Sequence, residues 1–165
     1  MLRLLVLVFL TAGCAAAPAP APAVGPDPDV EFAAMMIPHH QQALELSALV
    51  AGRTTDPTVT DLAFRIDRDQ VEEVGQLQGF LNLRGGPPPM PMHAMAGMAD
   101  APTLEALRAS SGPAFDRLWL RTMIAHHEGA LTMARDYPGG ALTEFARTLT
   151  LTQQAEIDRM RGALG

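Results

Sequence analysis

Residues 36–44 read MIPHHQQAL, and residues 123–131 read MIAHHEGAL. A second pair of segments follows in the same order, because residues 70–77 and 153–160 share the pattern Q-x-x-E-[VI]-x-x-[LM]. Two halves with the same order of motifs indicate an internal duplication. The two halves are therefore expected to fold alike.

Apolar residues in each half recur at steps of three and four positions, which is the spacing of one face of an α-helix. Gly and Pro residues near positions 52–57 and 138–140 interrupt this spacing and predict turns. The predicted fold is all-α, an antiparallel four-helix bundle made from a duplicated helical hairpin. The expected helices cover residues near 29–51, 58–83, 114–136 and 141–162, and Pro38 is expected to cause either a kink or a short irregular start in the first of them.

The bundle is joined by one long Met- and Pro-rich connection. The assigned segments are a bundle at residues 29–163, with a first hairpin at 29–83, a connector at 84–113 and a second hairpin at 114–163. Gly and Pro exclude a regular helix from the start of the connector. Residues 103–109 are expected to form one or two helical turns capped by Thr103.

The N-terminus has the composition of a targeting segment. An apolar run at residues 4–10 follows Arg3, and it is too short to span a bilayer but suits a signal peptide. Small residues before Cys14 resemble a lipobox, so residues 1–13 are expected to be a lipoprotein signal peptide and Cys14 to be lipidated. Residues 14–28, rich in Ala and Pro, would form a semi-rigid tether. The expected location is the cell envelope, lipid-anchored on its periplasmic or extracellular face; the alternative is an ordinary secretory signal with an incidental cysteine.

Composition narrows the classes of function. The chain has 165 residues, which suits one domain. Its net charge of −6 argues against nucleic acid as a partner, because cations are needed to neutralise phosphates. A single cysteine cannot form an internal disulfide or a Cys-based zinc site. The sequence leaves open whether copies of the chain associate as a homo-oligomer.

Six polar residues lie where a bundle seam normally carries aliphatic side chains. They are His39, Gln70 and Glu73 in the first half, and His126, Gln153 and Glu156 in the second. Counting from the turn places His39 level with Gln70, and Met36 level with Glu73. A buried polar group without a partner costs about 1–3 kcal/mol. The six are therefore expected either to satisfy one another in a structural His–Glu–Gln network or to bind a metal ion.

The neighbouring methionines favour a soft metal. Met36 precedes His40 by four positions and Met123 precedes His127 by four, so each pair shares a helix face. Thioether together with imidazole favours copper, especially Cu(I), and silver by analogy. Carboxylate with imidazole also admits Cu(II), zinc or iron. The simpler alternative is that methionines fill gaps in a core, which we favour for Met133 or Met160 taken alone.

The connector contains a second concentration of candidate ligands. Its members are Met90, Met92, His93, Met95 and Met98. This stretch has no periodic core to fill, so it either captures Cu(I) or Ag(I) loosely or is a flexible linker with methionines on the bundle surface.

The paired M-I-x-H-H-x-x-A-L and Q-x-x-E-[VI]-x-x-[LM] segments resemble the bacterial family catalogued as domain of unknown function 305. The resemblance covers residues 28–163 and implies a ferritin-like four-helix bundle. Family members commonly carry signal sequences and include periplasmic copper-binding proteins linked to copper resistance. The metal-site residues that the resemblance implies are Met36, His39, His40, Glu73, Met123, His126, His127, Met133, Glu156 and Met160. The chain departs from the family at Leu46 and Leu77, where methionine is frequent.

The combined expectation is an envelope lipoprotein that binds copper or silver ions for sequestration or resistance. We expect no catalytic turnover, because the motifs of the common hydrolases and nucleotide-binding enzymes are missing. His127-Glu128 begins like the HExxH zinc motif, but Leu131 stands at the second histidine position. The alternative is a metal-free structural or partner-binding lipoprotein, and a weaker third one is a redox-active metal enzyme such as an oxidase of Cu(I).

Overall fold

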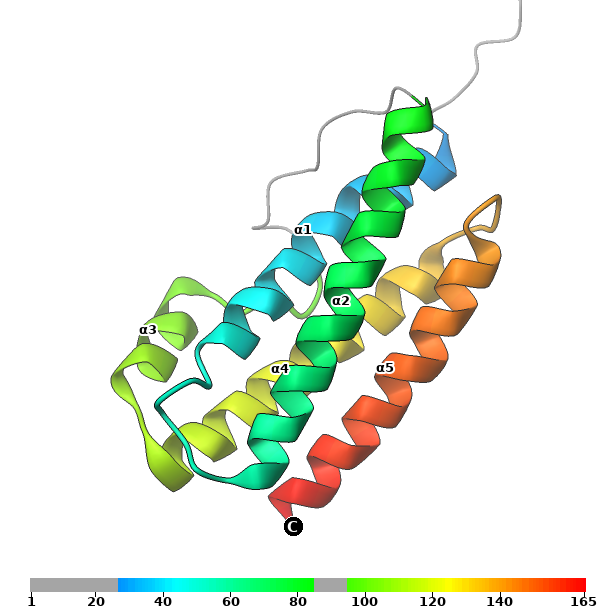
Figure 1. Cartoon of the computed structure of the whole chain (residues 1–165). Coiled ribbons are helices and arrows are strands. Elements are labelled where there is room, and N and C mark those ends of the chain that lie inside the picture. The colour runs from blue at the N-terminus through cyan, green and yellow to red at the C-terminus, as the bar shows by residue number, and fades with distance from the viewer. Residues whose placement is uncertain (1–26, 85–94) are drawn as a thin grey trace, which may run out of the picture.

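The computed structural model describes residues 27–84 and 95–165, and the regular elements within these ranges are all α-helices (Figure 1). They are α1 (Pro28–Ala48), α2 (Pro57–Arg84), α3 (Ala101–Ala109), α4 (Gly112–Asp136) and α5 (Thr143–Leu164). Helices α1 and α2 form one hairpin, and α4 and α5 form the other. The predicted all-α bundle of two helical hairpins is confirmed. Cys14, Met90, Met92 and His93 lie outside the described residues.

Three details of the helices differ from expectation. The first helix ends at Ala48 rather than near residue 51, because the chain turns through Gly52, whose φ of 73° suits a residue without a side chain. The helix continues through Pro38 without a break. Thr103 is not the cap of α3: the cap is Asp100, whose carboxylate accepts a hydrogen bond of 2.9 Å from the Thr103 amide.

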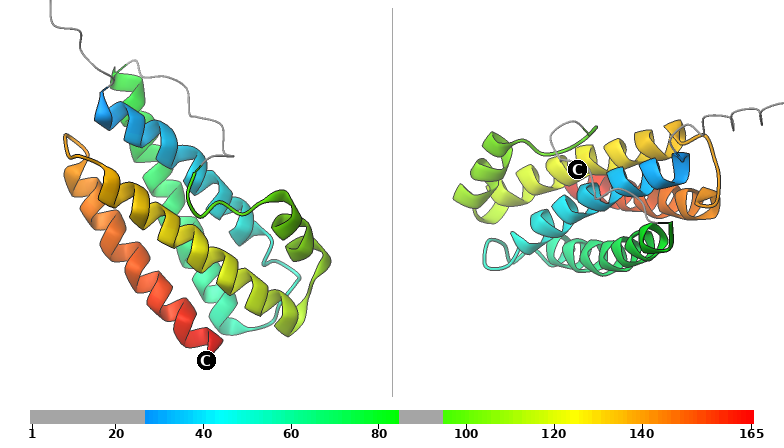
Figure 2. Two further views of the ribbon diagram at one scale, coloured as in Figure 1. Left: turned by 180° about the vertical axis from the view of Figure 1, so that it is seen from behind. Right: turned by 90° about the horizontal axis from the view of Figure 1, so that it is seen from above.

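Helices α1 and α4 cross antiparallel at the centre, while α2 and α5 lie to one side and contact each other little (Figures 1 and 2). Two contacts define the register of the central pair. Near one end the Trp119 indole donates to the Leu46 carbonyl oxygen at 2.8 Å. Near the other the rings of Phe32 and Tyr137 pack with centroids 4.7 Å apart. Residues that rise in number along α1 therefore meet residues that fall in number along α4.

The interior contains two apolar clusters. One gathers side chains around Trp119, Leu46 and Leu107, at the end where α3 lies. The other gathers side chains around Phe32, Leu77 and Leu149, at the end of the α4–α5 turn. Each long helix crosses from one cluster to the other, and its buried histidines, glutamines or glutamate lie near its middle, between two apolar stretches.

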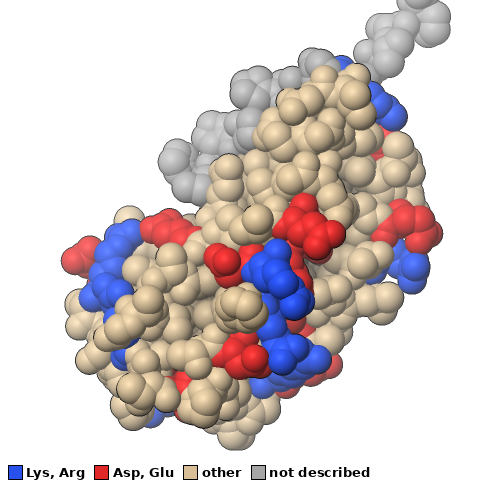
Figure 3. Space-filling model, in the orientation of Figure 1, with Lys and Arg blue, Asp and Glu red and all other residues tan. Residues whose placement is uncertain are grey.

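The outer face of α2 and α5 carries charges of both signs close together (Figure 3). Neighbouring residues form exposed ion pairs, such as Arg65 with Asp61 at 2.7 Å. Exposed pairs of this kind contribute little to stability. Among the described residues, no helix is long and apolar enough to cross a membrane.

Candidate metal centre

The middle of the bundle is a buried polar layer. All four histidines of the two HH motifs are fully buried. The members of the layer are His39, His40, Gln70, Glu73, His126, His127, Gln153 and Glu156. The inward orientation expected for the imidazoles and acids is therefore present, and the two motifs meet across the α1–α4 interface.

Each hairpin contributes one histidine–glutamate pair. His127 Nε2 lies 2.8 Å from Glu156 Oε2 and forms a buried hydrogen bond. His40 Nε2 lies 2.8 Å from Glu73 Oε2, although this contact lacks hydrogen-bond geometry. The expected register was wrong by one helical turn, since His40 rather than Met36 lies level with Glu73. Counting from the turn does not give this partner, because contacts between α1 and α2, rather than the ends of the helices, set which helical turns align.

The other two histidines meet at the centre of the molecule. The rings of His39 and His126 lie with centroids 3.9 Å apart and planes tilted by 36°. Burial, and next the nearby His40, lower the pKa of His39 to about 3. Burial and the adjacent His39 also lower the pKa of His126 well below its usual value. Both rings are therefore neutral at physiological pH, which is the form that binds metal ions.

The two central rings differ in their hydrogen bonds. His39 Nε2 lies 3.1 Å from the Ala96 carbonyl oxygen. Because a carbonyl only accepts, His39 donates through Nε2–H and keeps its lone pair on Nδ1. His126 has no hydrogen-bond partner for either ring nitrogen within the part of the chain that the structure describes. A buried nitrogen lone pair without a partner is costly, and a metal ion or a water molecule would relieve that cost.

A short strap, residues 95–100, is responsible for this difference. The backbone N–H of Ala99 donates a hydrogen bond to Gln42 Oε1 at 2.7 Å. The side-chain Nε2 of Gln42 donates one in return to the Ala99 carbonyl oxygen at 2.9 Å. Gly129 on α4 provides the space for it, since a Cβ atom there would lie 2.0 Å from the Ala96 carbonyl oxygen. The contacts of Gln42 and Gly129 with the strap were not predicted from the sequence. Gln42 and Gly129 occupy matching places in the two repeats, so their dissimilarity was the available signal.

The structure places the methionines that were expected as ligands in different parts of the bundle. Met36 lies fully buried in the cluster around Phe32, whereas Met123 and Met160 lie fully buried in the cluster around Trp119. Met133 is half-buried at the edge of the bundle. Met95 and Met98 line a cleft beside Gln42. Packing within an apolar cluster agrees with the gap-filling role of methionine.

Within residues 27–84 and 95–165, no three or more His, Cys, Asp or Glu side chains are grouped so that they could hold a metal ion. The glutamates that approach the layer are already paired with histidines. A carboxylate of this layer could therefore bind a metal ion only if its contact with histidine opened.

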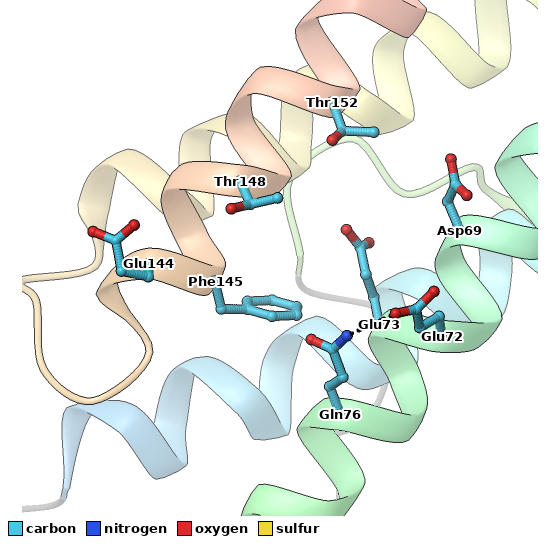
Figure 4. Close-up of a pocket in the computed structure, with 8 residues that line it drawn as sticks. All are labelled: Asp69, Glu72, Glu73, Gln76, Glu144, Phe145, Thr148 and Thr152. Atoms are coloured by element: carbon cyan, nitrogen blue, oxygen red, sulfur yellow. Dashed lines mark hydrogen bonds between the residues drawn. The ribbon is translucent and has the colours of Figure 1, made fainter.

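A cleft of about 490 Å³ lies between α2 and α5, and Glu73 forms part of its wall (Figure 4). Its acidic side chains are Asp69, Glu72, Glu73 and Glu144. Two of them are neutralised locally, Asp69 by Arg68 at 2.6 Å and Glu144 by Arg147 at 3.0 Å. Glu73 connects this cleft to the interior, because its carboxylate also contacts His40.

Comparisons with known proteins agree with this architecture. Residues 29–164 match the family model DUF305, a domain of unknown function. No curated protein matches the chain. A DUF305 fragment from Deinococcus radiodurans is 35% identical, with a TM-score of 0.79, covering 87% of this chain and 99% of that one.

Two other solved structures are similar. A DUF305 protein from Streptomyces coelicolor, described as secreted, is 32% identical with a TM-score of 0.74, and the match covers 81% of this chain and 90% of that one. CopM in its Cu(I)-bound form is 30% identical with a TM-score of 0.67, and the match covers 81% and 93%. CopM also has Ag-bound and Cu(II)-bound forms.

Proposed function

This chain belongs to the DUF305 family, and from that premise we propose that it is an envelope protein that binds Cu(I) or Ag(I) to sequester the ion. Its similarity to CopM, which has copper-bound and silver-bound forms, supports the choice of ion. The observation that carries the proposal is the His39–His126 pair, whose rings lie 3.9 Å apart in the core while both nitrogens of His126 lack a partner among the described residues.

The proposed ligands are the imidazoles and carboxylates of the polar layer together with nearby thioethers. The full set is Met36, His39, His40, Glu73, Met123, His126, His127, Met133, Glu156 and Met160. Entry of an ion at His126 breaks no protein hydrogen bond or ion pair, whereas entry at Nε2 of His127 breaks its bond to Glu156 and entry at Nε2 of His40 displaces Glu73. His126 is therefore the proposed first ligand of the buried site.

We further propose that Cys14 carries a lipid that anchors the chain in the envelope, and that the protein binds its ion without catalytic turnover. The lipobox-like residues before Cys14 support the anchor. The Ala- and Pro-rich residues that follow would hold the bundle away from the membrane surface.

The test is a Cu(I) titration against a competing chelator, using the chain with Cys14→Ser so that no thiol competes. His126→Asn should weaken binding by roughly tenfold or more. Gln153→Leu is the matched control, because it removes a buried amide that has no partner in the described structure but no imidazole. Binding equal to that of a His126, His127 and Met123 triple variant would reject the buried site.

A metal-free structural role is the second candidate, and two contacts favour it, because His127 is hydrogen-bonded to Glu156 and the His40 ring lies 2.8 Å from the Glu73 carboxylate. That candidate predicts that Cu(I) binds no more tightly to the chain than to the triple variant. It also predicts that unfolding stability does not rise with added Cu(I), whereas an ion that binds only the folded state raises it.

A further inference from the structure

Another cleft is lined by residues of α1 and α4 near the Phe32–Tyr137 ring pair. Figure 2 shows that this end of the two helices lies away from α3. The cleft has a volume of about 260 Å³. It is lined by Pro28, Glu31, Phe32, Met35, Met133, Asp136, Tyr137 and Pro138. Two half-buried thioethers, one from each central helix, therefore face the same opening.

The register of α1 against α4 explains why Met35 and Met133 line the same cleft. The Phe32–Tyr137 ring pair lies at the outer end and the His39–His126 pair at the centre. Met35 lies one helical turn before His39, and Met133 lies one turn before Tyr137. Both thioethers thus fall between two ring pairs whose contacts hold the helices together.

At the other end of the bundle, the equivalent part of the α1–α4 interface is covered by protein. There α3 covers the α1–α4 interface, and Leu107 packs fully buried in the cluster around Trp119. By the repeat, Met133 corresponds to Leu46, while Glu31 and Asp136 correspond to Leu118 and Leu49. Met35 corresponds to Thr122. The covered end is therefore mostly aliphatic and has no thioether at these positions, whereas the open end combines sulfur with carboxylates.

The charges at the open cleft suit a cation. Glu31 is exposed and forms no ion pair with any residue that the structure describes, whereas Asp136 is paired with Arg135 at 3.0 Å. The aromatic faces of Phe32 and Tyr137 line the same opening and can attract a cation through their ring electrons. Thioether sulfur selects soft monovalent ions over hard ones.

We propose that Met35 and Met133 form a second, solvent-accessible site for a soft monovalent cation, Cu(I) or Ag(I), separate from the buried polar layer. Met133, which the family resemblance places among the ligands of the layer, is assigned to this cleft instead, because it is half-buried and lines the opening. The proposal depends on the proposed function only for the identity of the ion. Glu31 adds negative charge at the rim, and the two sulfur atoms provide the ligands. The site would take up the ion at the surface without opening a His–Glu pair.

The test is a silver titration followed by NMR of the methionine methyl groups. The full chain with Cys14→Ser is labelled at these groups and titrated with silver nitrate in chloride-free buffer. The Met35 and Met133 methyl resonances should shift together. In Met35→Leu, which keeps an apolar side chain of similar size, half-saturation of the Met133 shift should require roughly tenfold more silver. Met133→Leu should weaken the Met35 shift in the same way.

Met98→Leu is the matched control, because Met98 is also half-buried but lies in the strap outside this cleft. It should leave the Met35 and Met133 shifts unchanged. Unchanged Met36 and Met160 resonances in ion-free Met35→Leu would establish that the bundle is intact. The proposal is overturned if Met35 and Met133 do not respond to silver, or if Met35→Leu leaves the Met133 response intact.

The same titration separates this site from the buried one. Ring resonances of His126 and His127 report on the polar layer. Shifts confined to Met35 and Met133 would support the cleft and contradict the buried site, whereas shifts confined to the histidine rings would do the opposite.

Discussion

The two hairpins carry the same HH motif, yet the single connector makes their surroundings different. Over the first motif the strap accepts a hydrogen bond from His39, while the matching His126 has no partner within residues 27–84 and 95–165. At Gln42 the strap is held by two hydrogen bonds, whereas at the matching Gly129 it is held by close packing. A duplicated sequence therefore produces unequal sites, because a connector that occurs once cannot contact both halves alike.

The same lesson applies to the ends of the bundle. One end of the α1–α4 interface is covered by α3, and the other is open and carries Met35 and Met133. Chemical accessibility thus differs between the halves even where the helices are equivalent. If the comparison is correct, substitutions at matching positions should have unequal effects.

The largest effect is expected where α3 covers the bundle. Leu107→Ala removes a fully buried side chain from the cluster around Trp119 and should cost about 2–5 kcal/mol of unfolding free energy. Urea unfolding measures this cost. Leu83→Ala, at a side chain that is 90% exposed, should change stability by less than about 0.5 kcal/mol. Equal costs would mean that α3 does not stabilise its end of the bundle.

The next effect concerns two matching aspartates. Asp29 accepts hydrogen bonds from the Tyr137 hydroxyl and from the Ala141 and Leu142 amides, so Asp29→Asn should cost about 1.5–3 kcal/mol. Asp116 has a buried carboxylate oxygen without a partner in the described ranges, so Asp116→Asn should be nearly neutral or stabilising. Thermal unfolding of both variants checks the difference, and a larger loss for Asp116→Asn would reverse it.

The contribution of Asp29 should also depend on pH. Burial raises the pKa of its carboxyl, but the hydrogen bonds from Tyr137 and the two amides lower it further, so the net shift is downward. A pKa that is lower in the folded state gives stability that is complete above the unfolded value, about 3.9, and is lost as pH falls through the folded value. The stability difference between the parent and Asp29→Asn should therefore shrink in acid. A difference that grows on acidification would contradict this sign.

A somewhat smaller effect is expected at the strap. In Gly129→Ala the new methyl group meets backbone atoms of Ala96 and Gly97, so the strap must move, at a cost of about 1–3 kcal/mol. Hydrogen exchange of the Ala99 amide should accelerate as its bond to Gln42 opens. Gly79→Ala is the control, because its methyl group would enter open space and should stabilise α2 by up to about 1 kcal/mol. Unchanged exchange in Gly129→Ala would mean that the strap does not depend on this glycine.

The smallest effect separates the two His–Glu pairs. Glu156→Gln weakens a hydrogen bond to His127 and should cost about 1 kcal/mol. Glu73→Gln should cost less, because its contact with His40 lacks hydrogen-bond geometry and its side chain is 15% exposed, against 7% for Glu156. Urea unfolding of both variants in metal-free buffer is the measurement. A greater cost for Glu73→Gln would show that the first pair is the stronger.

Much of the architecture could be predicted from patterns in the local sequence. Helix periodicity and the repeated motifs identified the two hairpins, and polar residues in the seam marked the layer where His39 and His126 meet. These features depend on the spacing of residues along one helix, which the sequence contains directly. The family resemblance stated from the paired motifs was also confirmed.

The tertiary structure alone decided the register, the strap and the open cleft. His40 rather than Met36 contacts Glu73, because packing between α1 and α2 sets which helical turns align. The partner of His39 is a backbone carbonyl, which no side-chain pattern predicts. Met35 and Met133 line the same cleft only because α1 and α4 cross, so their proximity depends on the packing of segments far apart in the chain.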